Sequence, residues 1–240
     1  MADPVLDIRG ISKHFGGFTA LSNVDLQVGE GERLGLIGPN GSGKTTMINC
    51  ISGALTNDEG EILFQGRNIN GMPAHKRTRL GIARSFQIPK PFASMTVLQN
   101  VAIPLEYAGR REGRRSIDDQ AREIVESMRL GNLVDTSAGA LNQIELRKLE
   151  LARAMAASPR LLISDEAMAG LSGNEVDEIL DILFLVNQRG VAVIMIEHIM
   201  RAVMRFSERI VVLDAGSKIA EGLPETIVNN PDVERAYLGE

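Results

Sequence analysis

The sequence predicts an α/β protein with a mainly parallel sheet, an antiparallel β-rich N-terminal part and an inserted α-helical subdomain. Short apolar runs alternate with helical patterns in the first and last thirds of the chain, whereas the middle region has helical periodicity without a convincing strand. A glycine-rich loop follows one of the first runs and opens a helical pattern. Alternation of this kind favours a parallel sheet with helices on both faces.

Length and composition are those of an ordinary globular protein. The chain has 240 residues, of which 44% are hydrophobic and 24% charged, so it can bury a substantial core. No run approaches the roughly 20 apolar residues of a membrane-spanning helix, and the first residues lack the pattern of a secretion signal. We therefore expect the chain to stay in the cytoplasm.

The charge balance argues against nucleic acid as a partner, because the net charge is −5 and nucleic-acid-binding surfaces are basic. One basic stretch, Arg110 to Arg115, favours a solvated loop, and a position near anionic lipid stays open. The single cysteine, Cys50, excludes an internal disulfide and is expected to be a small core residue.

The N-terminal part begins with short β-rich runs bounded by Gly, Asp or Asn. The pattern turns helical at Thr45, continues through Ile51 and ends at Gly53. The predicted strands are Val5 to Ile8, Val24 to Val28, Arg33 to Ile37 and Glu61 to Phe64.

We interpret residues 95–158 as a helical subdomain inserted into a core of residues 1–94 and 159–240, all within one domain of residues 1–240. Helical periodicity there covers Ile117 to Leu130 and Glu145 to Ala157. The strands predicted after it are Arg160 to Ser164, Val191 to Ile196 and Ile210 to Leu213, and the helices are Glu175 to Gln188 and His198 to Phe206.

The strongest functional motif is the glycine-rich loop between a predicted strand and a predicted helix. Its residues Gly38, Pro39, Asn40, Gly41, Ser42, Gly43, Lys44 and Thr45 match the pattern G-x-x-x-x-G-K-[ST], and Thr46 completes the loop. Glycines let backbone N–H groups point at phosphate oxygens, and the helix N-terminus adds positive partial charge. We predict that Lys44 reaches the β- and γ-phosphates of ATP and that the Thr45 hydroxyl binds Mg²⁺. The motif predicts a P-loop NTPase fold.

Two further motifs follow predicted strands. The apolar run Leu161 to Ser164 ends in Asp165 and Glu166. We predict that Asp165 holds Mg²⁺ and that Glu166 orients and polarises the attacking water as a general base. The next predicted strand is followed by Glu197 and His198, and the imidazole of His198 can hydrogen-bond the γ-phosphate and the attacking water. All three motifs are expected at the same edge of the sheet.

These motifs in this order, with a helical insertion between the first and the second, resemble the ATP-binding cassette (ABC) family over essentially the whole chain. The resemblance implies further roles. Phe15 corresponds to the aromatic residue that stacks on adenine. Gln87 matches the glutamine that reaches Mg²⁺ and the attacking water and couples the site to the membrane partner. The stretch Ala169 to Ser172 matches the loop that crosses the dimer interface.

The finer resemblance is to the larger ATP-binding subunit of branched-chain amino-acid ABC importers. It rests on Phe15 to Gly17, Phe86 and Gln87, Met95 to Val101, Ile196 to His198, and the tail Asn230 to Gly239. It implies an ATPase that energises import of branched-chain or related amino acids, as a peripheral protein on the cytoplasmic face of the cell membrane. The implied partners are a second ABC ATPase subunit, two membrane permease subunits and, indirectly, a periplasmic or extracellular solute-binding protein.

The segment that corresponds to the family's signature Leu-Ser-Gly-Gly-Gln is Leu141 to Glu145, and it deviates strongly at three of five positions. Asn142 is a good helix N-cap that approximates a capping box with Glu145, and it can still donate a hydrogen bond to the nucleotide of the opposite subunit. Ile144 replaces a glycine where close backbone approach is needed, and Glu145 adds negative charge near a triphosphate. We expect a weakened signature.

A second departure is Ala167, where the family usually has proline, so the turn is expected to be looser while both carboxylates survive. The intact Lys44, Glu166 and His198 would work with an intact signature on a partner, whereas the converse site would be impaired. This asymmetry favours a heterodimer, and a homodimer of the isolated chain stays open.

Other functions stay open too. The retained Glu166 and His198 argue against a regulatory nucleotide-binding subunit with little hydrolysis, but the weak signature keeps that alternative open. A soluble ABC ATPase not tied to transport is disfavoured by the single cassette, without sustained heptads or a basic tail. A small-molecule kinase shares the P-loop but does not explain Gln87, the helical insertion and His198 in that order.

Overall fold

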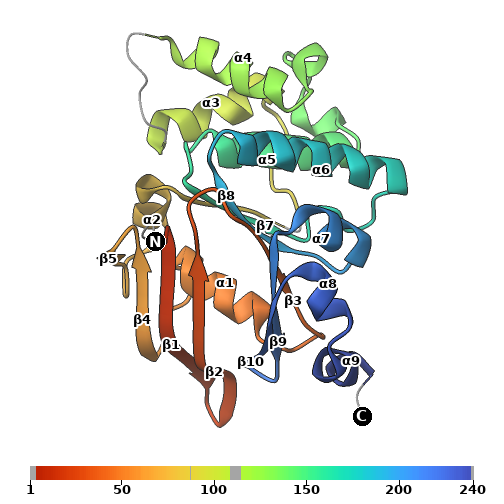
Figure 1. The fold of residues 1–240 in the computed structure, drawn as a ribbon. Helices are drawn as coiled ribbons and strands as arrows, with labels where there is room; N and C mark the ends of the chain where they lie inside the picture. The colour runs from red at the N-terminus through yellow and green to blue at the C-terminus, as the bar shows by residue number, and fades with distance from the viewer. Residues whose placement is uncertain (1–3, 87, 109–114, 239–240) are drawn as a thin grey trace.

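The protein has two β-sheets on either side of a buried helix, and further helices pack on the other face of the larger sheet (Figure 1). The computed structural model describes residues 4–86, 88–108 and 115–238. Within these ranges, no helix has the length and apolar character needed to cross a bilayer.

The larger sheet has six strands in the order β10-β9-β3-β8-β7-β6. The neighbours from β9 to β6 pair in parallel, and β10 pairs with β9 in the antiparallel direction. The bounds are β3 (Arg33–Ile37), β6 (Ile82–Ser85), β7 (Leu161–Asp165), β8 (Ala192–Ile196), β9 (Arg209–Asp214) and β10 (Ser217–Gly222). The predicted α/β class with a mainly parallel sheet is confirmed.

The smaller sheet is antiparallel and has four strands in the order β2-β1-β4-β5. Its strands are β1 (Leu6–Phe15), β2 (Phe18–Val28), β4 (Glu59–Phe64) and β5 (Arg67–Asn68). Helix α1 (Lys44–Ser52) contributes to a buried apolar cluster together with strands of both sheets, and Cys50 belongs to that cluster as predicted. The glycine-rich loop is therefore anchored between two packed layers.

Successive residues of the central strands face opposite sides of the larger sheet, as strand geometry requires. In β8, Ile194 joins the cluster around α1, whereas Val193 and Met195 join the cluster formed with the helices of the other face. Both faces are covered, so a central strand needs apolar residues at every position. This explains the uninterrupted apolar runs in the sequence.

Helices fill the region between β6 and β7 and cover the larger sheet. The remaining bounds are α2 (Ala74–Leu80), α3 (Val97–Tyr107), α4 (Ile117–Ser127), α5 (Gln143–Met155), α6 (Gly173–Gln188), α7 (Met200–Phe206), α8 (Pro224–Val228) and α9 (Pro231–Leu238). Figure 1 shows α3, α4 and α5 gathered at one end of the molecule. The boundaries of the helical subdomain at residues 95 and 158 stay a prediction.

Some predicted helices end differently in the structure. The helix predicted to run to Leu130 ends at Ser127, because Arg129 adopts a left-handed conformation with φ of 59°. The helix predicted to begin at His198 begins at Met200, which leaves His198 in the loop after β8.

Several short elements, α2, β5, β6, β10, α8 and α9, had not been predicted, and neither had the long helix α3. The short ones carry too few residues for a clear period, and their stability depends on packing. The basic stretch from Arg110 lies outside the described residues except for Arg115, which pairs with Glu123.

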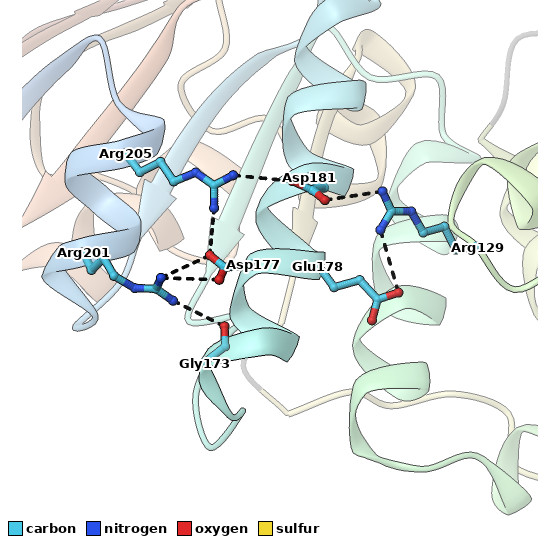
Figure 2. A network of polar contacts seen from close by, with 7 residues as sticks. All are labelled: Arg129, Gly173, Asp177, Glu178, Asp181, Arg201 and Arg205. Carbon is cyan, nitrogen blue, oxygen red and sulfur yellow. Dashed lines mark hydrogen bonds and ion pairs between the residues drawn. The ribbon is translucent and has the colours of Figure 1, made fainter.

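Helix α6 is tied by ion pairs to neighbours on both sides (Figure 2). From α7, Arg205 lies 2.7 Å from Asp177, and after α4, Arg129 lies 3.4 Å from Asp181. Arg201 also reaches Asp177, at 3.3 Å. Because these side chains are well exposed, each pair contributes at most about 1 kcal/mol.

Candidate nucleotide site

Three adjacent parallel strands bring the predicted motifs to one edge of the larger sheet. The glycine-rich loop follows β3, Glu166 follows β7, and His198 lies in the loop after β8. Strand β8 lies between β3 and β7 in the sheet, so the three carboxyl ends are neighbours. Residues far apart in sequence therefore meet here.

Glycines are required in the loop where its backbone approaches other parts of the chain. Gly38 has φ of 150°, and a Cβ atom there would lie 2.0 Å from the carbonyl oxygen of Leu213. Gly43 has φ of 104°, and a Cβ atom there would lie 2.7 Å from the carbonyl oxygen of Ala20. No side chain caps the N-terminus of α1, so its first N–H groups can donate to an anion.

Lys44 is held inside the loop. Its side-chain nitrogen donates to the carbonyl oxygens of Gly38 at 2.8 Å and Pro39 at 2.9 Å, and only 7% of the residue is exposed. Burial lowers the pKa of Lys44, and the negative charges of Glu166 and Asp165 oppose that change. A cation that faces two carboxylates within a glycine loop is suited to bind a triphosphate.

A cavity of about 250 Å³ collects most of the predicted site residues. It is lined by Phe15, Phe18, Ala20, Asn40, Gly41, Ser42, Gly43, Lys44, Thr45, Thr46, Glu166 and His198. Phe15 is 48% exposed and pairs with Phe18 across the turn between β1 and β2. The cavity therefore has aromatic faces beside a phosphate-type loop.

Glu166 and His198 face each other at the wall of this cavity. The Nε2 atom of His198 lies 3.2 Å from Oε1 of Glu166. Glu166 has φ of 48°, a conformation that costs a residue with a side chain on the order of 1 kcal/mol. Its N–H donates to the carbonyl oxygen of Ile196 at 2.9 Å, which fixes the strained residue against the end of β8.

Asp165 is held by a residue that the sequence analysis did not single out. One nitrogen of Arg84 donates to Oδ2 of Asp165 at 2.7 Å, and another donates to Oδ1 of Asn49 at 2.7 Å. The guanidinium also lies over the ring of Phe86, 5.0 Å from its centre. Arg84 thus connects α1, the end of β7 and the segment before Gln87.

The donor set suits Mg²⁺ only together with a nucleotide. Among the described residues, no group of three or more His, Cys, Asp or Glu side chains has the arrangement of a metal site. The hydroxyl of Thr45 and the carboxylate of Asp165 are oxygen ligands of the type that Mg²⁺ prefers, and phosphates and water supply the remaining ligands in sites of this kind. The residues present fit such a site.

Four predicted site residues are not among those that line the cavity: Gly38, Pro39, Asp165 and Asn142. Gln87 lies outside the described residues. Asn142 is exposed at the N-terminus of α5, and the predicted capping box is confirmed: Oδ1 of Asn142 accepts from the Glu145 N–H at 3.0 Å, and Oε2 of Glu145 accepts from the Asn142 N–H at 2.9 Å. The Ile144 side chain is buried in the apolar core.

Sequence reasoning missed Phe18, Arg84 and Glu197 as members of the site. The two glycines between Phe15 and Phe18 signal a tight turn that pairs the aromatics. Glu197 gave no signal of its own: it is 4% exposed, its Oε1 accepts from the Met168 N–H at 2.9 Å, and burial, together with the charge of Glu166, raises its pKa to about 7.

The chain is similar to known proteins along its whole length. It is 37% identical to the high-affinity branched-chain amino acid transport ATP-binding protein BraF of Pseudomonas aeruginosa, over 100% of both chains. It is 40% identical to the probable branched-chain amino acid transport ATP-binding protein LivG of Archaeoglobus fulgidus, over 98% of this chain and 95% of that one.

Solved structures of ATP-binding cassettes have the same fold as this chain. The ADP conformation of an ATP-binding cassette of an ABC transporter superimposes with a TM-score of 0.91, at 31% identity over 100% of both chains. A dimeric ATP-binding cassette bound to ADP and Pi gives a TM-score of 0.81, at 26% identity over 91% of this chain and 98% of that one.

Family models match two regions. Residues 217–240 match the family described as branched-chain amino acid ATP-binding cassette transporter, and residues 21–169 match the family described as ABC transporter. With a match over more than half its length, and the loop, carboxylates and histidine assembled at one sheet edge, the chain belongs to the ABC transporter family of ATP-binding cassettes.

Proposed function

We propose that this chain binds and hydrolyses ATP to energise an importer of branched-chain or related amino acids. The observation that carries the proposal is the single cavity that combines Lys44, Glu166 and His198. The names of the full-length relatives support the amino-acid substrate. The ATPase acts as a peripheral subunit on the cytoplasmic face of the membrane.

The site residues divide the work between binding and hydrolysis. The backbone N–H groups of residues 38–46 and the Lys44 ammonium bind the β- and γ-phosphates, and Phe15 stacks on adenine. Thr45 and Asp165 hold Mg²⁺, which when bound neutralises negative charge on the phosphates.

Hydrolysis needs a base beside the γ-phosphate. Glu166 orients the attacking water and accepts its proton, because its carboxylate is held at the end of β7 and faces the cavity. His198, 3.2 Å from Glu166, keeps that carboxylate in place and donates to the γ-phosphate. Gln87 is proposed to reach the water and Mg²⁺ from the segment after β6.

The working unit is proposed to be a pair of ATPase subunits, as in the dimeric cassette bound to ADP and Pi. In such a pair, each nucleotide lies between the phosphate loop of one subunit and the signature of the other. The capping box at the N-terminus of α5 occupies the N–H groups of Asn142 and Glu145, and Glu145 is acidic. Both features support a heterodimer with an intact signature on the partner.

The permease is proposed to dock where the helical region meets the core. A groove of about 320 Å³ there is lined by the exposed aromatic residues Phe86 and Phe92. Phe86 lies under Arg84, which also holds Asp165, so docking at this groove is physically connected to the nucleotide site.

The test is ATP hydrolysis by the purified chain, alone and mixed with the second ATPase subunit of the same transporter. We expect activity in the mixture and its loss, by at least about 100-fold, with Glu166→Gln. Glu208→Gln is the matched control, because Glu208 is exposed and pairs with Arg33 away from the cavity. Uptake of radiolabelled leucine into vesicles that contain the permeases and ATP should follow the same pattern.

The outcomes separate the alternatives. Nucleotide binding without hydrolysis in any mixture would point to a regulatory subunit and contradict the proposal. Full activity of the chain alone would support the proposed ATPase function and contradict the proposed heterodimer. Hydrolysis that never supports uptake of any amino acid would remove the transport function.

A further inference from the structure

The turn that follows Glu166, residues 167–170, is held from one side by helix α5. The carbonyl oxygen of Ala169 accepts from Nε2 of Gln143 at 3.3 Å and from a guanidinium nitrogen of Arg147 at 3.2 Å. The two donors are four residues apart, so they lie on the same face of α5. The start of α5 is thereby fastened to the turn beside the general base.

Glu197 holds the same turn from the other side. Its Oε1 accepts from the Met168 N–H at 2.9 Å, and its carboxylate also faces the N–H of His198. The charged groups that act on it are Glu166 and Arg147, and Arg147 is itself 8% exposed. One buried carboxylate thus contacts both the turn after Glu166 and the residue that bonds Glu166.

These contacts matter because Glu166 occupies an unfavourable conformation. With φ of 48°, it stays in place only if its surroundings fix it. The next residue is Ala167, which does not restrict the backbone as proline would. The turn is instead fixed by hydrogen bonds from α5 and from Glu197.

We propose that Glu197, Arg147 and Gln143 are positioning residues that hold Glu166 and His198 in the geometry needed for hydrolysis. We call this set the turn clamp. The proposal rests on the proposed ATPase function and extends it: the orientation of the general base depends on α5, the helix that begins at the divergent signature. Gln143, at a signature position, serves the chain's own active-site turn.

The test compares single variants in the mixture with the second ATPase subunit. Glu197→Ala and Arg147→Met should lower kcat by roughly 10- to 100-fold, because small displacements of a catalytic group have effects of that size. Binding of a fluorescent ATP analogue to the chain should change by less than about 2-fold, because neither side chain lines the cavity. Glu197→Gln should restore most of kcat, since its amide oxygen can still accept from the Met168 N–H.

Glu32→Gln is the matched control. Glu32 also accepts from a backbone N–H in a turn, that of Gly29 at 2.6 Å, but it lies away from the cavity. It should leave kcat and nucleotide binding unchanged.

Gln143→Ala keeps the test decisive if a buried variant does not fold, because Gln143 is exposed. It should lower kcat by about 3- to 10-fold with unchanged nucleotide binding.

Amide hydrogen exchange at Met168 gives a readout independent of turnover, and it should be faster in Glu197→Ala than in Glu32→Gln.

Several results would contradict the turn clamp even if the wild-type chain hydrolyses ATP as proposed. These are a Glu197→Ala kcat equal to that of Glu32→Gln, a raised KM with unchanged kcat, or a Gln143→Ala variant that matches wild type. Absence of wild-type hydrolysis would remove the ATPase function instead, and unchanged exchange at Met168 would then still refute the clamp.

Discussion

The N-termini of α1 and α5 both present backbone N–H groups, but these groups have different partners in the two helices. Helix α1 begins at Lys44 without a side-chain cap, after a glycine with φ of 104°, and its N–H groups face the cavity side of the loop. Helix α5 begins after Asn142, and its capping box occupies the N–H groups of Asn142 and Glu145. The first helix end has no cap and favours an anion, whereas the second is partly occupied by its own capping residues, one of which is acidic.

The comparison teaches that a motif position and a helix start do not by themselves make a binding site. What decides is whether the first N–H groups have partners within the chain. Beside the start of α1 lies the buried cation Lys44, whereas the first turn of α5 carries the acidic Glu145. Anion affinity should therefore belong to α1, with α5 serving the chain's own structure.

The largest effect should come from Lys44→Ala. Loss of the ammonium should weaken ATP binding or hydrolysis by at least about 100-fold, because a buried cation among phosphate oxygens has no substitute in the loop. The measurement is ATPase activity with titration of a fluorescent ATP analogue. Asn142→Ala in the same assay should leave nucleotide binding by the isolated chain unchanged; equal losses in both variants would break the comparison.

Glu197 should make stability depend on pH. Its pKa is about 7 in the folded chain and about 4.5 in the unfolded one, so the folded state binds the proton more tightly. The resulting stabilisation is complete below pH 4.5 and is lost as the pH rises towards 7, with a magnitude of order 3 kcal/mol.

Urea unfolding of wild type and Glu197→Gln at pH 5 and pH 8.5 measures this effect. The variant cannot ionise, so it should gain stability relative to wild type as the pH rises. A constant difference between the two chains across this range would contradict the prediction.

Asn142→Ala should cost about 1 kcal/mol of unfolding free energy, because it removes the cap of α5. Thr96→Ala is the matched comparison, since Thr96 forms the same type of capping box at α3. The melting temperature in thermal unfolding should fall by roughly 2–4 °C in each variant. A loss confined to Thr96→Ala would mean that Asn142 is not a structural cap.

The smallest effect should come from Glu145→Gln, which keeps an acceptor for the capping box and removes the charge. The test uses a mixture with the second ATPase subunit in which this chain also carries Glu166→Gln, so that its own site is inactive. The remaining hydrolysis comes from the site formed by the partner's phosphate loop and this chain's signature. Its rate should rise by about 2- to 5-fold. Unchanged hydrolysis would mean that the charge of Glu145 does not limit this half-site.

The nucleotide site itself could be predicted from sequence because its parts are short local patterns. Residues Gly38 to Thr45 form a contiguous motif, and Glu166 and His198 each follow an apolar run long enough to read as a buried strand. Parallel strands that end at one edge bring such residues together in any sheet of this type. The role of Phe15 came instead from the resemblance to the ABC family, and its pairing with Phe18 had not been predicted.

The sequence by itself determined the order of strands and helices, the phosphate loop, the carboxylate pair, the histidine and the divergence at Asn142 to Glu145. Only the tertiary structure decided that β8 lies between β3 and β7, that Arg84 reaches Asp165, and that Gln143, Arg147 and Glu197 converge on one turn. The physical reason is that periodicity and turn chemistry act over a few residues. Contacts between side chains that are distant in sequence depend on how whole elements pack.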